Sequence, residues 1–187
     1  DEWIAAATDT GGVQVLNFEL FLGVGGTLLG TAAGHGIAQR TAIVGNNQFS
    51  QLTFRSIYGA GGRSGPAVHT SYGTNPTTGA LEELAGYAAM YDSTLHTISL
   101  RYYGPATDPT ASTGVDLGTY PAEIVFDDRL RIESRGANKY VYLNSVLIIS
   151  AIHDDLSEGR PGAMSNKTAA SGGLSWDDWM GGDTGWA

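Results

Sequence analysis

The sequence predicts an all-β protein made of two antiparallel sheets. Glycine occurs 27 times in 187 residues, whereas charged residues make up only 16% of the chain. Many glycine-centred turns with few charged helical faces are typical of β-sandwiches and barrels. Hydrophobic residues form 42% of the chain, which is enough to fill a core between two layers. The length fits a single domain, 1–187.

Strands are clearest where apolar and polar residues alternate. In Gln48–Tyr58, Leu52 and Phe54 fall on one face, and Gln51 and Arg55 fall on the other. We expect a helical turn at 81–84 and a long irregular loop at 104–121, a segment that holds three of the six prolines. Further strands are predicted at 13–24, 27–29, 37–44, 66–72, 86–91, 95–103, 123–127, 129–134, 139–143, 146–151 and 174–179. Asn144 and Ser145 have the length of a two-residue hairpin turn between two of these strands.

Composition excludes several functions. The formal net charge is −9, so the chain repels phosphates and we expect no nucleic-acid partner. There is no cysteine for disulfides or thiolate metal sites. No apolar run reaches the roughly 18 residues of a membrane span, so we expect no membrane insertion. The glycine-rich segment 23–36 lacks the Gly-Lys-Ser/Thr ending of a phosphate loop, which argues against a nucleotide site.

Short phrases in the middle and C-terminal parts carry a family resemblance. They are Asn47-Gln48-Phe49-Ser50-Gln51-Leu52, Gly65-Pro66-Ala67-Val68-His69, Arg129-Leu130-Arg131-Ile132-Glu133, Val141-Tyr142-Leu143-Asn144-Ser145-Val146-Leu147, Gly159-Arg160-Pro161-Gly162 and Trp176-Asp177-Asp178-Trp179. In this order they resemble the concanavalin A-like lectin/glucanase superfamily, in its laminin-G-like branch found in phage structural and bacterial surface proteins. Ser145 stands where that branch usually has glycine, and residues 1–40 match poorly. The resemblance implies a jelly-roll sandwich with one concave sheet.

The same superfamily contains glycanases, lectins and structural modules, so function has to be argued from the site. Its retaining glycosidases carry two glutamates flanking an aspartate on one strand, which brings two carboxyl groups to about 5–5.5 Å. No predicted strand here offers that triplet: Glu19, Glu123, Glu133 and Glu158 are isolated, and Glu82 and Glu83 are adjacent. The four histidines are far apart, and there is no Gly-x-Ser-x-Gly elbow. We therefore expect no catalytic residues and no enzyme, with a glycoside hydrolase or polysaccharide lyase as the remaining catalytic alternative.

Strand alternation suggests a polar binding face. If Leu52, Phe54, Val68, Ile98 and Leu100 point into the core, their neighbours point outward. The predicted ligand-binding residues are Gln51, Arg55, His69, Tyr87, Tyr91, Arg101 and Tyr103. On one concave sheet, their rings would stack on sugars, and two arginines would suit an acidic glycan. The alternative is that these side chains only meet water or a neighbouring subunit.

Together these features predict a non-catalytic virion or surface structural module, such as a decoration protein of phage or bacterial origin. A lectin-like carbohydrate-binding module is the alternative. The expected partners are other virion or surface subunits, glycans, or further copies of the chain, and the expected location is a virion, the cell surface or the extracellular space. We expect no cofactor, although the pairs Asp127-Asp128 and Asp154-Asp155 leave calcium as an open alternative. Trp176 and Trp179 are expected in the core.

Overall fold

The computed structural model describes residues 3–7, 13–16, 27–30, 34–40, 43–58, 62–74, 81–107, 114–167 and 173–185. The regular elements in these ranges are β-strands. They are β1 (Trp3–Ala7), β2 (Val13–Leu16), β3 (Thr27–Gly30), β4 (Gly34–Arg40), β5 (Gln48–Tyr58), β6 (Arg63–Thr74), β7 (Leu81–Asp92), β8 (Thr97–Thr107), β9 (Val115–Pro121), β10 (Arg129–Arg135), β11 (Asn138–Leu143), β12 (Val146–Ile152), β13 (Arg160–Lys167) and β14 (Gly173–Asp183). No helix in the described ranges is long and apolar enough to cross a membrane.

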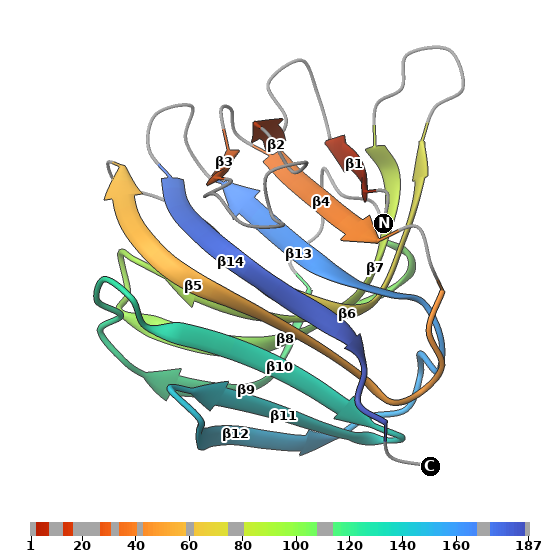
Figure 1. The fold of residues 1–187 in the computed structure, drawn as a ribbon. Coiled ribbons are helices and arrows are strands. Elements are labelled where there is room, and N and C mark those ends of the chain that lie inside the picture. The colour runs from red at the N-terminus through yellow and green to blue at the C-terminus, as the bar shows by residue number, and fades with distance from the viewer. Residues whose placement is uncertain are drawn as a thin grey trace.

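Two large sheets form the layers of a sandwich (Figure 1). The first has seven strands in the order β1-β4-β13-β6-β7-β8-β9, and the second has five in the order β12-β11-β10-β5-β14. β2 and β3 form a separate two-stranded sheet. All neighbours pair in the antiparallel sense. The chain changes sheet repeatedly, as from β4 to β5 and back to β6, which confirms the predicted all-β jelly-roll sandwich.

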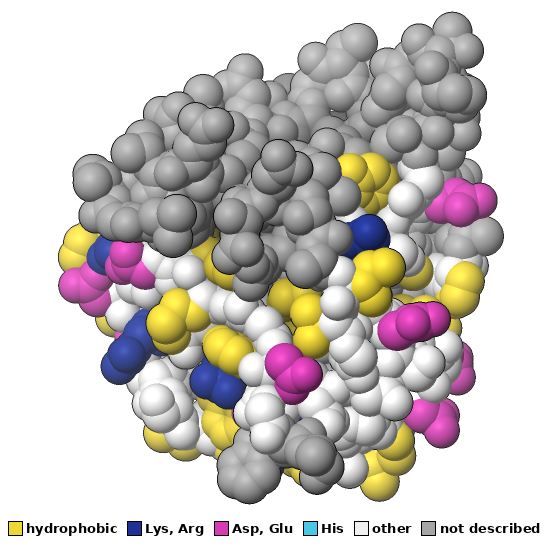
Figure 2. Space-filling model, turned by 45° about the vertical axis from the view of Figure 1, so that its right-hand side comes forward, with side chains coloured by type: hydrophobic (Ala, Val, Ile, Leu, Met, Phe, Trp, Pro, Cys, Tyr) yellow, Lys and Arg dark blue, Asp and Glu magenta, His cyan; other side chains and the backbone are white. Residues whose placement is uncertain are grey.

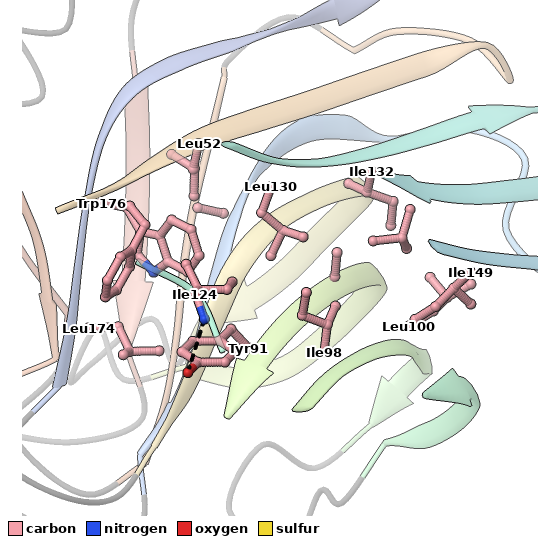
Figure 3. Packing of buried hydrophobic residues seen from close by; sticks show 14 of the residues in the cluster. Leu52, Tyr91, Ile98, Leu100, Ile124, Leu130, Ile132, Ile149, Leu174 and Trp176 are labelled. Carbon is pink, nitrogen blue, oxygen red and sulfur yellow. Dashed lines mark hydrogen bonds between the residues drawn. The ribbon is translucent and has the colours of Figure 1, made fainter. Parts of the chain in front are cut away.

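The main core lies between the two sheets (Figure 3). It contains all five residues that alternation placed inward: Leu52, Phe54, Val68, Ile98 and Leu100. Trp176 is fully buried, packs edge-to-face on Phe54 at 5.4 Å, and donates its indole N–H to Ser64 Oγ at 2.7 Å. Trp179 packs against the same core, and its indole N–H donates to Ser50 Oγ at 2.9 Å. The predicted core role is confirmed for Trp176, whereas Trp179 is only partly buried and lies at the margin of the core.

A second buried cluster lies on the other face of the seven-stranded sheet. Its members come from β4, β6, β7, β8 and β13 and are Ile37, Ala67, Leu84, Ala88, Met90, Tyr103 and Met164. The strand β7 therefore contributes to buried clusters on both of its faces. A strand buried on both sides loses the polar alternation that would identify its inward face.

Several local predictions are corrected. Residues 81–84 are the beginning of β7 rather than a helical turn, because Leu84 pairs with Thr107 of β8. The segment 104–121 is not one irregular loop, since β8 extends to Thr107 and Val115–Pro121 forms β9 along the edge of β8. Residues 123–127 do not form a strand. The hairpin between β11 and β12 is confirmed, with Asn144 and Ser145 at φ 50° and 70°, as a two-residue turn of this type requires.

Candidate functional site

The seven predicted ligand residues do not share one face. Gln51 and Arg55 lie on β5, in the five-stranded sheet, whereas the other five lie on β6, β7 and β8 of the seven-stranded sheet. The expectation that these strands are neighbours is confirmed for β6, β7 and β8, which pair in that order, and is wrong for β5, which pairs with β10 and β14. The chain passes from the five-stranded sheet to the seven-stranded sheet between β5 and β6, so β5 does not pair with the strands that follow it directly in the sequence.

Three of the seven point into the interior. Tyr87 and Tyr91 belong to the core between the sheets and are fully buried, whereas Ala88 and Met90 take the outer face that was assigned to the tyrosines. His69 has φ 53° and lies where the pairing of β6 with β7 is irregular. This bulge turns its ring inward, where Nε2 lies 2.8 Å from Ser134 Oγ of the opposite sheet.

Arg101 and Tyr103 do share the outer face of the seven-stranded sheet, but both are buried. They are 5% and 0% exposed. The Arg101 guanidinium lies 3.1 Å from the Asp116 carboxylate and 5.9 Å from the centre of the Tyr103 ring. Both side chains thus contact other residues of the protein and are not exposed to a ligand.

Gln51 lies on the outer face of the five-stranded sheet, in a row that crosses all five strands. Directly paired residues of antiparallel strands project to the same side. Through the pairing of β14, β5, β10, β11 and β12, this row consists of Met180, Gln51, Arg131, Tyr142 and Leu147. The next row contains Phe49, Glu133, Tyr140 and Ser150. We call these two rows the outer face.

Aromatic rings give the outer face a platform, in which the ring planes of Tyr140 and Tyr142 are inclined by 41°. Tyr140 and Tyr142 lie on the same strand with ring centres 6.4 Å apart. The Arg131 guanidinium covers the Phe49 ring at 4.3 Å, and that of Arg135 lies 5.6 Å from the Tyr140 ring. Burial and the nearby carboxylate of Glu133 raise the pKa of Tyr142 above its ordinary value of 10, so this hydroxyl stays protonated near neutral pH. Such a platform offers ring faces together with hydrogen-bonding edges.

Glu133 forms ion pairs with both arginines of this platform. Its carboxylate accepts hydrogen bonds from Arg135 Nε at 2.8 Å and from Arg131 Nη2 at 3.4 Å. The Glu133 side chain is only 4% exposed, although it stands on an outer sheet face. The two arginines therefore cover this carboxylate, and it in turn orients both guanidinium groups.

Arg55 lies at one end of the outer face, surrounded by carboxylates. It pairs with Asp127 and Asp178, and its Nε lies 3.4 Å from Asp177. The Phe126 ring centre lies 5.4 Å from the guanidinium. The internal pairs leave Arg55 little capacity for a ligand. In Figure 2, basic and acidic side chains likewise lie interspersed with hydrophobic ones on the face that it draws.

The acidic pairs considered for calcium have partners within the protein. Asp128 accepts hydrogen bonds from the backbone N–H of Val125 at 2.8 Å and from Asn144 Nδ2 at 2.6 Å. The Asp155 carboxylate lies 3.8 Å from His153 Nε2. Within the described ranges, no group of three His, Asp or Glu side chains is arranged to hold a metal ion.

A polar cluster is buried between the sheets, away from the outer face. Lys139 is fully buried, donates to the Gly136 carbonyl at 2.7 Å, and lies 4.7 Å from the Tyr87 ring centre. Burial lowers the pKa of Lys139 to about 8. Burial and the charge of Lys139 lower the pKa of His69 to about 4, and burial raises the pKa of Tyr87 to about 12. The Tyr87 hydroxyl lies 2.9 Å from His153 Nδ1, and this contact joins the segment that follows β12 to the core.

Sequence reasoning missed most of the outer face. Phe49, Arg131, Glu133, Tyr140 and Tyr142 were absent from the predicted ligand set. The alternation of Arg131 and Glu133 with Leu130 and Ile132 did carry the signal that they point outward. The missing information was that β10 and β11 follow β5 in the same sheet.

Comparison with known proteins finds similarity in fold but none in sequence. No family model matches the chain, and no curated protein sequence does. A carbohydrate-binding module, CBM66 from Bacillus subtilis, superposes with a TM-score of 0.60 at 15% identity, over 96% of this chain and 94% of that one. A legume lectin-like domain from Entamoeba histolytica gives 0.64 at 13% identity, over 98% and 90%. The fold is that of the concanavalin A-like lectins.

A third lectin-like structure extends the comparison. The exoplasmic/lumenal domain of VIP36, in a form bound to Ca²⁺ and Man3GlcNAc, gives a TM-score of 0.58 at 12% identity, over 96% of this chain and 81% of that one. At such low identities the similarity shows the fold alone. These structures confirm the predicted superfamily fold and give no support for the virion role that the sequence analysis put first.

Proposed function

We propose that this chain is a non-catalytic carbohydrate-binding module whose ligand lies on the outer face of the five-stranded sheet. The observation that carries the proposal is the pair of tyrosine rings on β11, Tyr140 and Tyr142, with Gln51 and Arg131 beside them on the outer face. The apolar face of a sugar ring stacks on such rings, while its hydroxyl groups bond the amide and guanidinium edges. Of the predicted ligand residues, Gln51 contributes to the platform and Arg55 borders it.

The number of carboxylates on the outer face supports a binding role without catalysis. The two rows contain a single carboxylate, Glu133, which is covered by Arg131 and Arg135. Retaining glycosidases need two carboxyl groups about 5–5.5 Å apart with access to the sugar. One covered carboxylate does not meet that requirement.

The fold comparisons support the lectin-like alternative over a virion or decoration role. The structures reported above include a carbohydrate-binding module and a glycan-bound lectin-like domain. The proposed partners are therefore glycans, and the proposed location is the cell surface or the extracellular space.

The test is a glycan array with the whole chain, followed by titration calorimetry on the best ligand. We expect Tyr142→Ala to weaken binding about tenfold, because one stacked ring contributes roughly 1–1.5 kcal/mol. Tyr120→Ala is the matched control, since Tyr120 is 40% exposed on β9 of the other sheet. No glycan binding by the wild type, or equal losses in the two variants, would refute the proposed site.

A further inference from the structure

Resting on this proposed function, we infer that Glu133 sets the specificity of the outer face, which binds uncharged oligosaccharides and excludes acidic ones. The sequence suggested the opposite, because Arg55 and Arg101 were expected to suit an acidic glycan. In the structure both of these arginines lie against aspartates, and the arginines of the outer face lie against Glu133.

The guanidinium groups nearest the platform share one internal carboxylate. Arg135 Nε donates to Glu133 at 2.8 Å, and Arg131 Nη2 donates at 3.4 Å. Each guanidinium also lies against an aromatic ring, Phe49 for Arg131 and Tyr140 for Arg135. A ligand carboxylate would have to compete with Glu133 for groups that are already oriented and bonded.

The wider charge balance also opposes an acidic ligand. Arg55, at the end of the outer face, is held by Asp127, Asp177 and Asp178. The ion pairs around Arg55 and those around Glu133 together contain three arginines and four carboxylates. The whole chain carries a formal net charge of −9. An anionic glycan would therefore approach against repulsion, whereas a neutral one would meet aromatic rings and hydrogen-bonding edges.

The spacing of the rings indicates a ligand longer than one sugar. Phe49 lies on β5 and Tyr140 on β11, with Glu133 of β10 between them in the same row. Two strand spacings separate the backbones that carry these rings by about 10 Å, which exceeds the width of a single pyranose ring. An oligosaccharide lying across the strands would span both positions, where it would meet the guanidinium groups of Arg131 and Arg135 that lie against the two rings.

The experiment compares neutral gluco-oligosaccharides with oligouronates of equal length, using the whole chain and titration calorimetry. We expect the wild type to bind the neutral series and not the oligouronates. We expect Glu133→Gln to raise the ratio of oligouronate to neutral affinity about tenfold, because it frees two guanidinium groups for a ligand carboxylate. Glu123→Gln removes the same charge from an exposed position and should leave this ratio unchanged.

Two outcomes would overturn the inference. The first is wild-type binding of oligouronates as tight as that of neutral chains, which would leave the proposed function standing. The second is an unchanged ratio in a folded Glu133→Gln protein. If that variant does not fold, the salt dependence of wild-type binding decides. Binding that stays constant between about 50 and about 500 mM salt supports a neutral ligand, and a steep loss refutes it. Absence of all glycan binding would instead refute the proposed function.

Discussion

Replacing Lys139 with methionine removes a positive charge from the protein interior, and we expect the folded state to become more stable at pH 7. Lys139 is fully buried, and its ammonium is solvated by the Gly136 carbonyl at 2.7 Å and by the Tyr87 ring at 4.7 Å. Methionine has a similar length and carries no charge. The Gly136 carbonyl keeps a second donor, the Ser134 hydroxyl at 3.3 Å, so the substitution does not leave it unbonded.

The size of the effect follows from the pKa of Lys139. Burial lowers this pKa from 10.5 to about 8, which corresponds to about 3 kcal/mol against the charged form in the folded protein. Loss of the bond to Gly136 offsets about 1 kcal/mol of the gain. We therefore expect Lys139→Met to raise the free energy of unfolding by about 2 kcal/mol, in line with other buried charges replaced by apolar residues.

Urea unfolding followed by tryptophan fluorescence measures this gain as a function of pH. The unfolded chain holds the Lys139 proton up to pH 10.5, whereas the folded protein releases it near pH 8. Wild-type stability therefore rises through this window, and the advantage of the variant should be constant below pH 8 and fade towards pH 10.5. Arg129→Met, which removes a positive charge from an exposed position, should show neither effect. A destabilised Lys139→Met protein, or a gain independent of pH up to 10.5, would refute the reasoning.

Two further predictions concern buried polar groups. The pKa of His69 falls from 6.5 to about 4 in the folded protein, so on acidification the unfolded chain takes up this proton first. The free energy of unfolding of the wild type should therefore drop by about 3 kcal/mol from pH 6.5 to 4. This drop should be smaller in His69→Asn. Equal pH slopes in the two urea-unfolding series would contradict this. Ser64→Ala removes the acceptor of the Trp176 indole N–H, a bond of 2.7 Å, and should lower the free energy of unfolding by about 1–3 kcal/mol. An unchanged thermal midpoint would show that this bond contributes nothing.

Local patterns predicted much of the fold because they depend on a few consecutive residues. The alternation in β5 and β10 placed Leu52, Phe54, Leu130 and Ile132 in the core, where the structure has them. The Asn144-Ser145 turn was likewise readable, since both residues must adopt positive φ in a turn of two residues.

Other elements could not be predicted from local patterns. The strand β9 ends in proline and lies in a proline-rich segment, a composition that favours a loop. It forms a strand because it pairs with the edge of β8, where a terminal proline is tolerated. In β7, apolar side chains occupy both faces, so alternation could not decide whether Tyr87 or Ala88 points between the sheets.

The sequence by itself determined the class of fold, the positions of many strands and the inward residues of the strands that alternate. Only the tertiary structure decided which strands are neighbours, and with them the candidate site. Gln51 belongs beside Arg131 and Tyr142 rather than beside Arg101, because β5 pairs with β10 across a long separation in the chain. Periodicity along one strand fixes the direction of a side chain. The neighbours of that side chain depend on strand pairing over long distances, which short-range periodicity does not encode.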